Sequence, residues 1–397
     1  MNSADDPLTA DGLIDADALT ALTVDLVQAP SENPGGTEAQ TVAVLEKACR
    51  QAGLEVSTRE VAPDRPNLVA TLHGGDGPGL MLLGHSDVVP AGPGWTADPY
   101  RARVTGDGRI IGRGATDMKG GLAAVVAAMS ALHSSGAILS GPVQLVCTVD
   151  EEEHGSGVRD LVRHHPGEFL GCVVAEPTDL TVVRGCRGAS YIEVDITGRA
   201  AHSGRPDDGR SAIYAAAAIV ELIRADHVAM TSAASGLLRS GTWNVGTLTG
   251  GQGISVVAPT AALGIDRRLM PDEDAHAIAA WLRSRITAAG IDSDGITVDV
   301  RVTMEMPGFQ TPPDHPLVTT AVAALERRGV PGVVGGWSAA CDGGFINRDL
   351  GIPAIVLGPG NINADAHQPD ESVRIADLCT AASIYTQMAL ALLSPTD

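Results

Sequence analysis

Basic residues are scarce in this sequence. Lys and Arg together number 27 against 48 Asp and Glu, which gives a formal net charge of -21. A nucleic-acid-binding surface requires a basic face, so this balance argues against a nucleic-acid partner. The same deficit disfavours binding to an anionic membrane surface. The excess of acidic residues is most simply explained by acidic side chains on the solvated surface.

Long apolar runs and paired cysteines are also lacking. No apolar run approaches the ~20 residues that span a bilayer, and the acidic stretch 1–15 has none of the basic and apolar regions of a secretory leader. The six cysteines are scattered without a Cys-x-x-Cys pair. Cys147 and Cys172 lie in apolar strand-like runs, where a thiol behaves as a small hydrophobe. We therefore expect a cytoplasmic protein with no membrane partner, no disulfide framework and no sulfur-ligated zinc.

Continuous apolar runs alternate with helix-like segments over much of the chain. The runs are typical of strands buried on both faces of a parallel sheet, and they cover residues 80–85, 143–149, 172–176 and 354–358. Between the first two, residues 120–135 place apolar side chains on one face at helical spacing. This alternation predicts an α/β domain with a mainly parallel sheet.

The middle of the chain has a different pattern. Residues 191–198 and 296–303 alternate apolar and polar side chains with a period of two, as in an antiparallel sheet with one wet face. The helix-like stretches 211–225 and 274–290 could cover the other face. These segments predict a smaller α+β domain with an antiparallel sheet and two helices.

The order of these segments predicts a discontinuous layout. At 397 residues the chain is longer than one ordinary core, so two domains are expected. We predict that residues 186–307 are inserted into an α/β domain made of residues 1–185 and 308–397. The strand at 354–358 must then return to the sheet of the first domain.

Side chains that can bind metal follow the ends of the apolar runs. They are His85 and Asp87, Asp117, the acidic run 150–153, Glu176, and His367. In an open α/β sheet the functional crevice lies outside the carboxyl ends of the strands, so these groups should converge. Carboxylates that converge repel one another and raise their pKa values unless a cation joins them. One or two divalent ions are therefore expected.

Several segments resemble the M20 metallopeptidase/deacylase family, in particular its acetylornithine deacetylase and succinyl-diaminopimelate desuccinylase branch. In chain order they are GHSDVVPAG, GRGATDMKGG, VDEEEHGSG, AEPTDL, GRAAHSGRPDDG, IDRRLMPDED, ACDGGF and NADAHQPDESV. The resemblance implies a zinc-dependent α/β catalytic domain with an inserted dimerisation (lid) domain. It also implies hydrolysis of the amide bond of an N-acyl amino acid.

The resemblance implies two metal sites that share one carboxylate. Asp117 would bridge two zinc ions, with cobalt or manganese as alternatives. His85 and Glu176 would complete one site, and Glu152 and His367 the other. The family also implies a cis peptide bond between Asp117 and the next residue.

Two further acidic residues take catalytic positions in this resemblance. Asp87 would orient His85, because residues i and i+2 of a strand face the same way. Glu151 would be the general base that takes a proton from the attacking water and delivers it to the leaving amine.

The acidic run is one residue longer than the usual family pattern. Counting from Asp150 makes Glu151 the base and Glu152 the ligand, whereas counting from Gly155 makes Glu152 the base and Glu153 the ligand. We favour the first register because the apolar strand fixes where the sheet ends.

The remaining site residues lie in the inserted domain and the C-terminal part. His202 matches a family histidine that reaches into the partner's active site and stabilises the oxyanion, which implies at least a homodimer. Arg268 matches a family arginine that binds the substrate carboxylate, with its neighbour Arg267 as the alternative. Ser255 stands where the family commonly has Asn.

The segment ACDGGF resembles a family loop that binds carboxylate. Asp342 and Gly343 in this segment are therefore further substrate-binding candidates, although a cysteine stands where the family has threonine.

The leading hypothesis is an acetylornithine deacetylase-like hydrolase. A desuccinylase, or a dipeptidase or carboxypeptidase, uses the same chemistry and stays open. From another class, a non-catalytic metal-binding homologue would be expected to lack the base or a ligand, and all are present. A dinucleotide-binding oxidoreductase is excluded because GRGATDMKGG has no Gly-x-Gly-x-x-Gly turn.

Overall fold

The computed structural model describes residues 13–164 and 167–395, and the chain forms two compact units. Unit 1 contains the described chain up to Gly185, Gln310–Gly335, and the described chain from Phe345 onward. Unit 2 contains Cys186–Phe309 and Gly336–Gly344. Residues 1–12, which hold most of the acidic stretch on which the expectation of no leader rests, lie outside the described residues.

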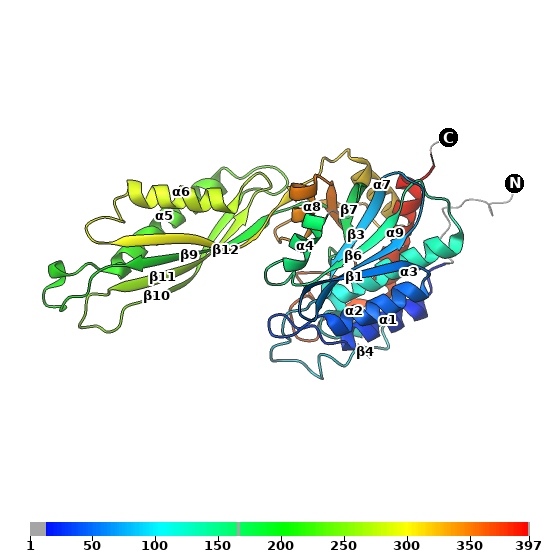
Figure 1. The fold of residues 1–397 in the computed structure, drawn as a ribbon, viewed down its shortest axis with the longest axis horizontal. Helices are drawn as coiled ribbons and strands as arrows, with labels where there is room; N and C mark the ends of the chain where they lie inside the picture. The colour runs from blue at the N-terminus through cyan, green and yellow to red at the C-terminus, as the bar shows by residue number, and fades with distance from the viewer. Residues whose placement is uncertain (1–12, 165–166, 396–397) are drawn as a thin grey trace. The chain divides into compact units, whose positions relative to one another are not determined.

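Unit 1 is built on a mixed sheet whose centre is parallel (Figure 1). Strand β3 is parallel to β6 and β7, and β15 is parallel to β7. The strands in spatial order are β1 (Glu55–Ala62), β2 (Arg65–Leu72), β6 (Val143–Thr148), β3 (Gly79–His85), β7 (Phe169–Val174), β15 (Ala354–Val356), β8 (Val182–Cys186) and β13 (Phe309–Gln310), with β14 (Val334–Trp337) paired to β8. Every residue of β3 is buried, as expected for a strand covered on both faces.

Helices cover both faces of this sheet. Most of the core lies under α1 (Ala16–Gln28), α2 (Ala39–Gln51), α3 (Gly120–Ser135), α7 (Pro316–Arg327) and α9 (Ile375–Leu392). Helix α4 (Ser156–His164) contacts β1, β2 and β6, and α8 (Gly343–Leu350) follows β14 in the chain. A small sheet of β4 (Arg103–Val104), β5 (Arg109–Ile111) and β16 (Ser372–Arg374) joins the C-terminal part of the chain to the segment before α3.

Helix α9 is long and apolar enough to cross a membrane by length and composition alone, with a mean hydropathy of 1.3. However, 61% of it is buried inside the structure, and it packs against α3 and α7. This burial is typical of a core helix of a folded domain.

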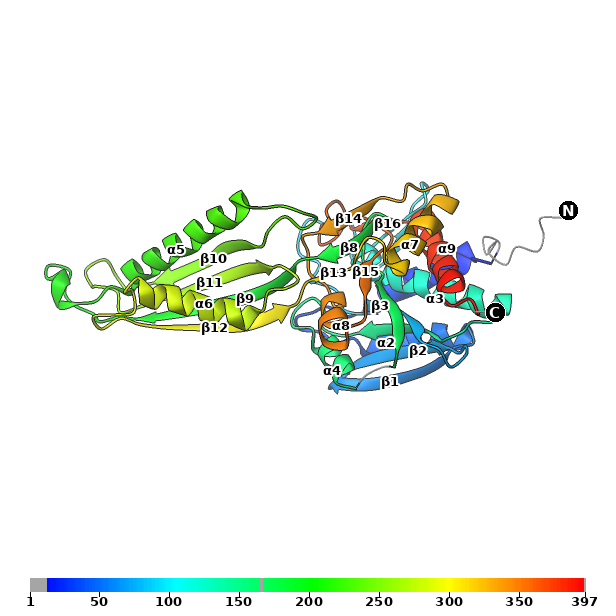
Figure 2. The same ribbon diagram turned by 90° about the horizontal axis from the view of Figure 1, so that it is seen from above.

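Unit 2 is an antiparallel sheet with two helices on one face (Figure 2). Its strands lie in the order β10 (Thr242–Gly250), β11 (Thr260–Leu269), β9 (Gly188–Thr197) and β12 (Thr297–Met306), covered by α5 (Ala212–Ser232) and α6 (Ala275–Ala288). Ile192, Val194 and Ile196 are buried under the helices, while Tyr191 and Glu193 are exposed. The predicted fold class is confirmed, and β15 does return to the sheet of unit 1.

Candidate metal centre

The strand ends of unit 1 bring distant residues to one place. His85 is the last residue of β3, and Glu176 follows the end of the neighbouring parallel strand β7. Asp117 lies in the segment Ala115–Lys119 that leads into α3, where its backbone dihedral angles are not helical. Because parallel strands end at the same edge of a sheet, these three side chains can meet.

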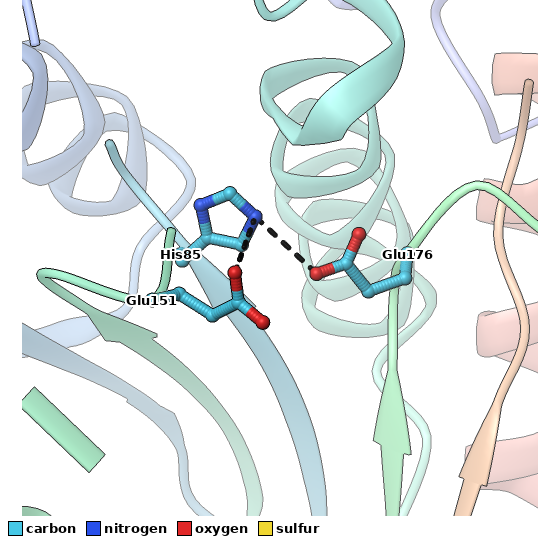
Figure 3. A group of neighbouring side chains, drawn as sticks. All are labelled: His85, Glu151 and Glu176. Atoms are coloured by element: carbon cyan, nitrogen blue, oxygen red, sulfur yellow. Dashed lines mark ion pairs between the residues drawn. The ribbon is translucent and has the colours of Figure 1, made fainter. Parts of the chain in front are cut away.

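His85 lies at the centre of an acidic group. Its Nε2 is 3.3 Å from Asp117 Oδ1, 3.3 Å from Glu176 Oε1 and 3.9 Å from Glu151 Oε2. Figure 3 shows the imidazole of His85 with this nitrogen directed toward the carboxylates of Glu151 and Glu176. Three carboxylates therefore share one edge of a buried imidazole.

His367 contacts the other side of Asp117. Its Nε2 is 3.3 Å from Asp117 Oδ2 and 3.1 Å from Glu152 Oε1. Asp117 thus presents one oxygen to each histidine. The structure brings together all five side chains predicted as ligands, in the two pairs expected, although their role as ligands stays a prediction.

Asp87 connects His85 to the acidic run. Its Oδ1 is 3.3 Å from His85 Nδ1. Its two oxygens also accept the backbone N–H groups of Glu151, at 3.2 Å, and Glu152, at 3.1 Å. Burial opposes the charge of Asp87, but the bond to His85 holds its pKa below the usual value. The Asp87 carboxylate therefore holds both the imidazole of His85 and the backbone of the acidic run.

Glu152 and Glu153, the ligands in the two counting registers of the acidic run, lie in different surroundings. Glu152 contacts His367 with a side chain only 8% exposed, whereas Glu153 is 37% exposed and lies 4.0 Å from His154 Nε2. Glu151 contacts His85. This placement supports the register that makes Glu151 the base and Glu152 the ligand.

The electrostatics of the cluster show excess negative charge. Burial, together with the charge of Asp117, raises the pKa of Glu176 to about 8 and raises that of Glu152 as well. Hydrogen bonds to Asp117 and Glu152 raise the pKa of His367 to about 10. Burial opposes the charge on His85, but Glu176 and Asp117 still hold its pKa well above the usual value.

A divalent cation fits this set of side chains. Among the described residues, His85 forms one candidate metal-binding group with Glu151 and Glu176, and another with Asp117 and Glu152. Imidazole nitrogens and carboxylate oxygens suit zinc, cobalt and manganese. Burial first, and then repulsion by Asp117, raises the pKa values of Glu152 and Glu176, and such a cation would offset both effects.

Two residues of this region were not found from the sequence. Asn33 donates its side-chain amide to Asp87 Oδ2 at 2.9 Å and to Asp150 Oδ1 at 2.8 Å. Glu371, four positions after His367, accepts the backbone N–H of Asp117 at 3.0 Å. The cis peptide bond expected after Asp117 is present and joins it to Met118.

His202 and Ser255 lie side by side in unit 2. His202 is exposed, and its Nδ1 accepts the backbone N–H of Gly204 at 3.0 Å. The next residue, Ser203, donates its N–H to the carbonyl of Ser255 at 3.0 Å. The side chain of His202 is therefore available to a substrate or a second chain.

The two adjacent arginines of β11 point in different directions. Arg267 is buried, with its guanidinium 5.1 Å from the Trp243 ring and 2.6 Å from Glu273. Arg268 is half-buried and pairs with Asp266 at 3.0 Å. Arg268 is the one of the pair whose charge solvent can reach.

The remaining substrate candidates lie in the second segment of unit 2. Asp342 is buried, and Gly343 is the first residue of α8. A Cβ on the following residue, Gly344, would lie 1.7 Å from the carbonyl oxygen of Pro307, so this turn requires glycine.

Comparison with known proteins identifies relatives over nearly the whole chain. The sequence profile of peptidase family M20/M25/M40 matches residues 81–391. The chain is 32% identical over 352 residues to an acetylornithine deacetylase of Myxococcus xanthus, covering 86% of this chain and 88% of that protein. It is 31% identical over 388 residues to a succinyl-diaminopimelate desuccinylase of Methylobacterium radiotolerans, covering 93% and 95%.

Solved structures share the fold at lower identity. A tripeptidase from Staphylococcus aureus superposes with a TM-score of 0.78 at 24% identity, covering 97% of this chain and 100% of that one. A metallo-carboxypeptidase from Sulfolobus solfataricus also has a TM-score of 0.78, at 20% identity, covering 94% and 98%. At these identities the likeness shows the fold alone.

Proposed function

Because this chain belongs to peptidase family M20/M25/M40 and is a metal-dependent hydrolase, we propose that it cleaves the amide bond of an N-acyl amino acid. N-acetyl-L-ornithine is the first substrate to test, since an acetylornithine deacetylase is among its relatives at 32% identity. One observation carries this proposal: Asp117 lies between His85 and His367 with Glu151 beside the same cluster.

We propose two divalent ions, zinc first, with cobalt or manganese as alternatives. His85 and Glu176 would hold one, Glu152 and His367 the other, and Asp117 would contribute one oxygen to each. Bound there, the ions supply Lewis-acid polarisation of the substrate carbonyl and lower the pKa of water.

Glu151 is suited to move the proton of this reaction. Asp87 holds its backbone N–H, and its carboxylate is 11% exposed and adjoins His85. Glu151 takes a proton from the water that attacks the amide carbon, so that a C–O bond forms. It then delivers this proton to the amine nitrogen as the C–N bond breaks. The products are the free carboxylic acid and the free amino acid.

The experiment is hydrolysis of a panel by metal-stripped and zinc-reloaded protein. The panel contains N-acetyl-L-ornithine, N-succinyl-diaminopimelate, other N-acetylamino acids and dipeptides. We expect turnover of N-acetyl-L-ornithine that disappears with the metal and returns with zinc. Full activity after complete metal removal would contradict the mechanism, and hydrolysis of dipeptides alone would transfer the assignment to a peptidase.

A desuccinylase is the second candidate, and a basic group in unit 2 favours it. Burial lowers the pKa of Arg187, and the neighbouring charges of Arg268 and Arg239 lower it further. A basic group made of Arg187 and these two neighbours would suit a substrate that carries more than one carboxylate. A higher kcat/KM for N-succinyl-diaminopimelate than for N-acetyl-L-ornithine would select this candidate.

We also propose a homodimer formed through unit 2. Strand β10 is an edge strand of its sheet, and large apolar side chains are exposed on it, on α5 and in the loop after it: Leu248, Tyr214 and Ile254 respectively. Exposed edges and apolar patches favour association with another chain. In such a dimer the exposed His202 would be available to the partner's site, where it would stabilise the oxyanion.

A cytoplasmic location remains our proposal. Among the described residues no disulfide joins any of the six cysteines, five of which are buried. Reduced cysteines are the rule in the cytoplasm. Fractionation of the native host would test this location directly.

A further inference from the structure

Glu371 is a buried carboxylate that none of the proposed catalytic steps uses. Glu371 is 1% exposed. Its Oε1 accepts hydrogen bonds from two backbone N–H groups, that of Thr116 at 2.8 Å and that of Asp117 at 3.0 Å. Charge-assisted bonds of this kind are short and strong. The side chain of Glu371, from the C-terminal part of the chain, therefore holds the main chain of Asp117, the proposed bridging residue.

The other oxygen of Glu371 is held just as firmly. Arg113 Nη1 donates to Oε2 at 2.5 Å, and the guanidinium of Arg113 lies 5.2 Å from the ring of Trp95. Arg113 Nη2 also donates to the carbonyl of Ala91 at 3.1 Å. The planar guanidinium thus fixes Glu371 in one orientation.

Further bonds join the same two segments. Gly112 donates its N–H to the carbonyl of Glu371 at 2.9 Å, and Thr116 Oγ1 donates to the carbonyl of Ser372 at 2.8 Å. Strand β16 then pairs with β5, with Ser372 opposite Ile111. The segment before α3 and the segment after His367 therefore form one hydrogen-bonded body.

This hydrogen-bonded body holds Asp117 at both its carboxylate and its backbone. His367 contacts the Asp117 carboxylate, and Glu371 contacts the Asp117 backbone. We propose that Glu371 is a positioning residue that sets the Asp117 carboxylate between the two histidines, so that affinity at both metal sites depends on it. This inference rests on the proposed function in one respect, the assignment of Asp117 as the shared ligand.

The test is the binding of zinc and cobalt by E371Q, measured without substrate. The glutamine amide would set an N–H₂ group against either Arg113 or the backbone N–H groups, so one set of bonds is lost. We expect zinc affinity, measured by chelator competition, to fall by about 10–100-fold, the range seen when residues behind metal ligands are changed. The visible absorption spectrum of the cobalt-loaded protein should also change.

The matched control is E273Q. Glu273 accepts a guanidinium nitrogen of the buried Arg267 at 2.6 Å and the backbone N–H of Met270 at 2.8 Å, so it makes the same kinds of bond away from the proposed ligands. We expect E273Q to lower the melting temperature but to keep the zinc affinity and the cobalt spectrum. An equal loss of zinc affinity in E273Q would overturn the inference, because the effect would then be general destabilisation.

A second variant covers the case in which E371Q does not fold. Arg113→Lys keeps a cation opposite Glu371 but lacks the fork that also reaches Ala91, so zinc affinity should fall several-fold. Unchanged zinc affinity in whichever variant folds would overturn the inference. If none of the panel substrates is hydrolysed, that result contradicts the proposed function but not this inference, because the metal titrations need no substrate.

Discussion

At the scale of single residues, the centre depends on side chains that each serve several neighbours. Asp87 is fully buried and holds His85, two backbone N–H groups of the acidic run, and the amide of Asn33. A buried charge is costly unless hydrogen bonds surround it, and here they do. This arrangement fixes which members of the acidic run face the cluster.

The first prediction separates Glu151 from Glu153. Because Glu151 is proposed to move the proton, Glu151→Gln should lower kcat by about 10²–10⁴-fold. The zinc content and melting temperature of the Glu151→Gln variant should stay near those of the unchanged protein, since Glu151 is not a proposed ligand. Steady-state kinetics and metal analysis on the same preparation measure both quantities.

The matched control for this prediction is Glu153→Gln, two positions along the same run. Glu153 is the most exposed of the three glutamates and lies beside His154, so kcat should change less than twofold. The reverse result would establish the alternative register: Glu151→Gln would keep its kcat, and Glu153→Gln would lose most of its kcat.

The sequence predicts the residues that protrude from strand ends but not those that hold them. His85, Asp117, Glu152, Glu176 and His367 could be found because each follows an apolar run or belongs to a recognisable motif. Asn33 and Glu371 act on other side chains or on backbone N–H groups of segments far away in the chain. Such bonds leave no periodic pattern, so only the fold reveals them.

At the scale of elements, close packing at strand and helix ends positions the cluster. Helix α3 begins at Gly120, directly after the segment that carries Asp117, and packs against the end of β7. A Cβ on Gly121 would lie 2.2 Å from the carbonyl oxygen of Ala175, the residue before Glu176. This glycine lets the helix approach the strand end that carries Glu176.

The second prediction concerns this contact. Gly121→Ala should destabilise the protein by about 1–3 kcal/mol, because the added methyl overpacks the contact with Ala175. The displaced strand end should also lower zinc affinity. Urea denaturation of the metal-free protein and chelator competition measure the two effects.

Gly106→Ala is the control for Gly121→Ala. A Cβ at Gly106 meets no atom within 4 Å, so the free energy of unfolding should change by no more than about 0.5 kcal/mol. Equal effects of the two substitutions would show that the contact with Ala175 does not matter.

The central elements were predictable, whereas the peripheral ones were not. The helical spacing over 120–135 coincides with α3, and each of the four continuous apolar runs overlaps a strand at the parallel centre of the sheet. Strand β1 gave no signal because only Val56 of its eight residues is buried. Edge strands lack the burial that produces an apolar pattern.

At the scale of the whole molecule, the centre links protein stability to metal and pH. Without metal, Glu176 has a pKa of about 8 and His367 a pKa of about 10, both above their unfolded values. The folded metal-free protein therefore binds extra protons, and the stability linked to them is lost as pH rises from about 5 toward 10. Metal ions need the same groups deprotonated.

The third prediction follows from this linkage. The rise in melting temperature on adding zinc should be larger at pH 8 than at pH 6, because protons compete with the metal at the lower pH. Thermal unfolding of metal-free and zinc-loaded protein at the two pH values measures it. An equal or smaller rise at pH 8 would contradict the proposed ligands.

The fourth prediction concerns association through unit 2. Tyr214 is 79% exposed on α5, so Tyr214→Asp should place a charge in the proposed interface and shift a dimer toward monomer. Light scattering coupled to size-exclusion chromatography measures the mass. Ile138→Asp is the control, because Ile138 is 81% exposed in unit 1 and its substitution should leave the mass unchanged.

The place of β15 between β7 and β8 has a consequence during synthesis. The ribosome makes β7 and β8 first, then all of Cys186–Phe309, and only afterwards the strand that fills the gap. At ordinary translation speeds the nascent chain waits on the order of ten seconds with an open strand edge. An unpaired strand edge favours aggregation, so slowed elongation within the insert should increase the aggregation of this protein.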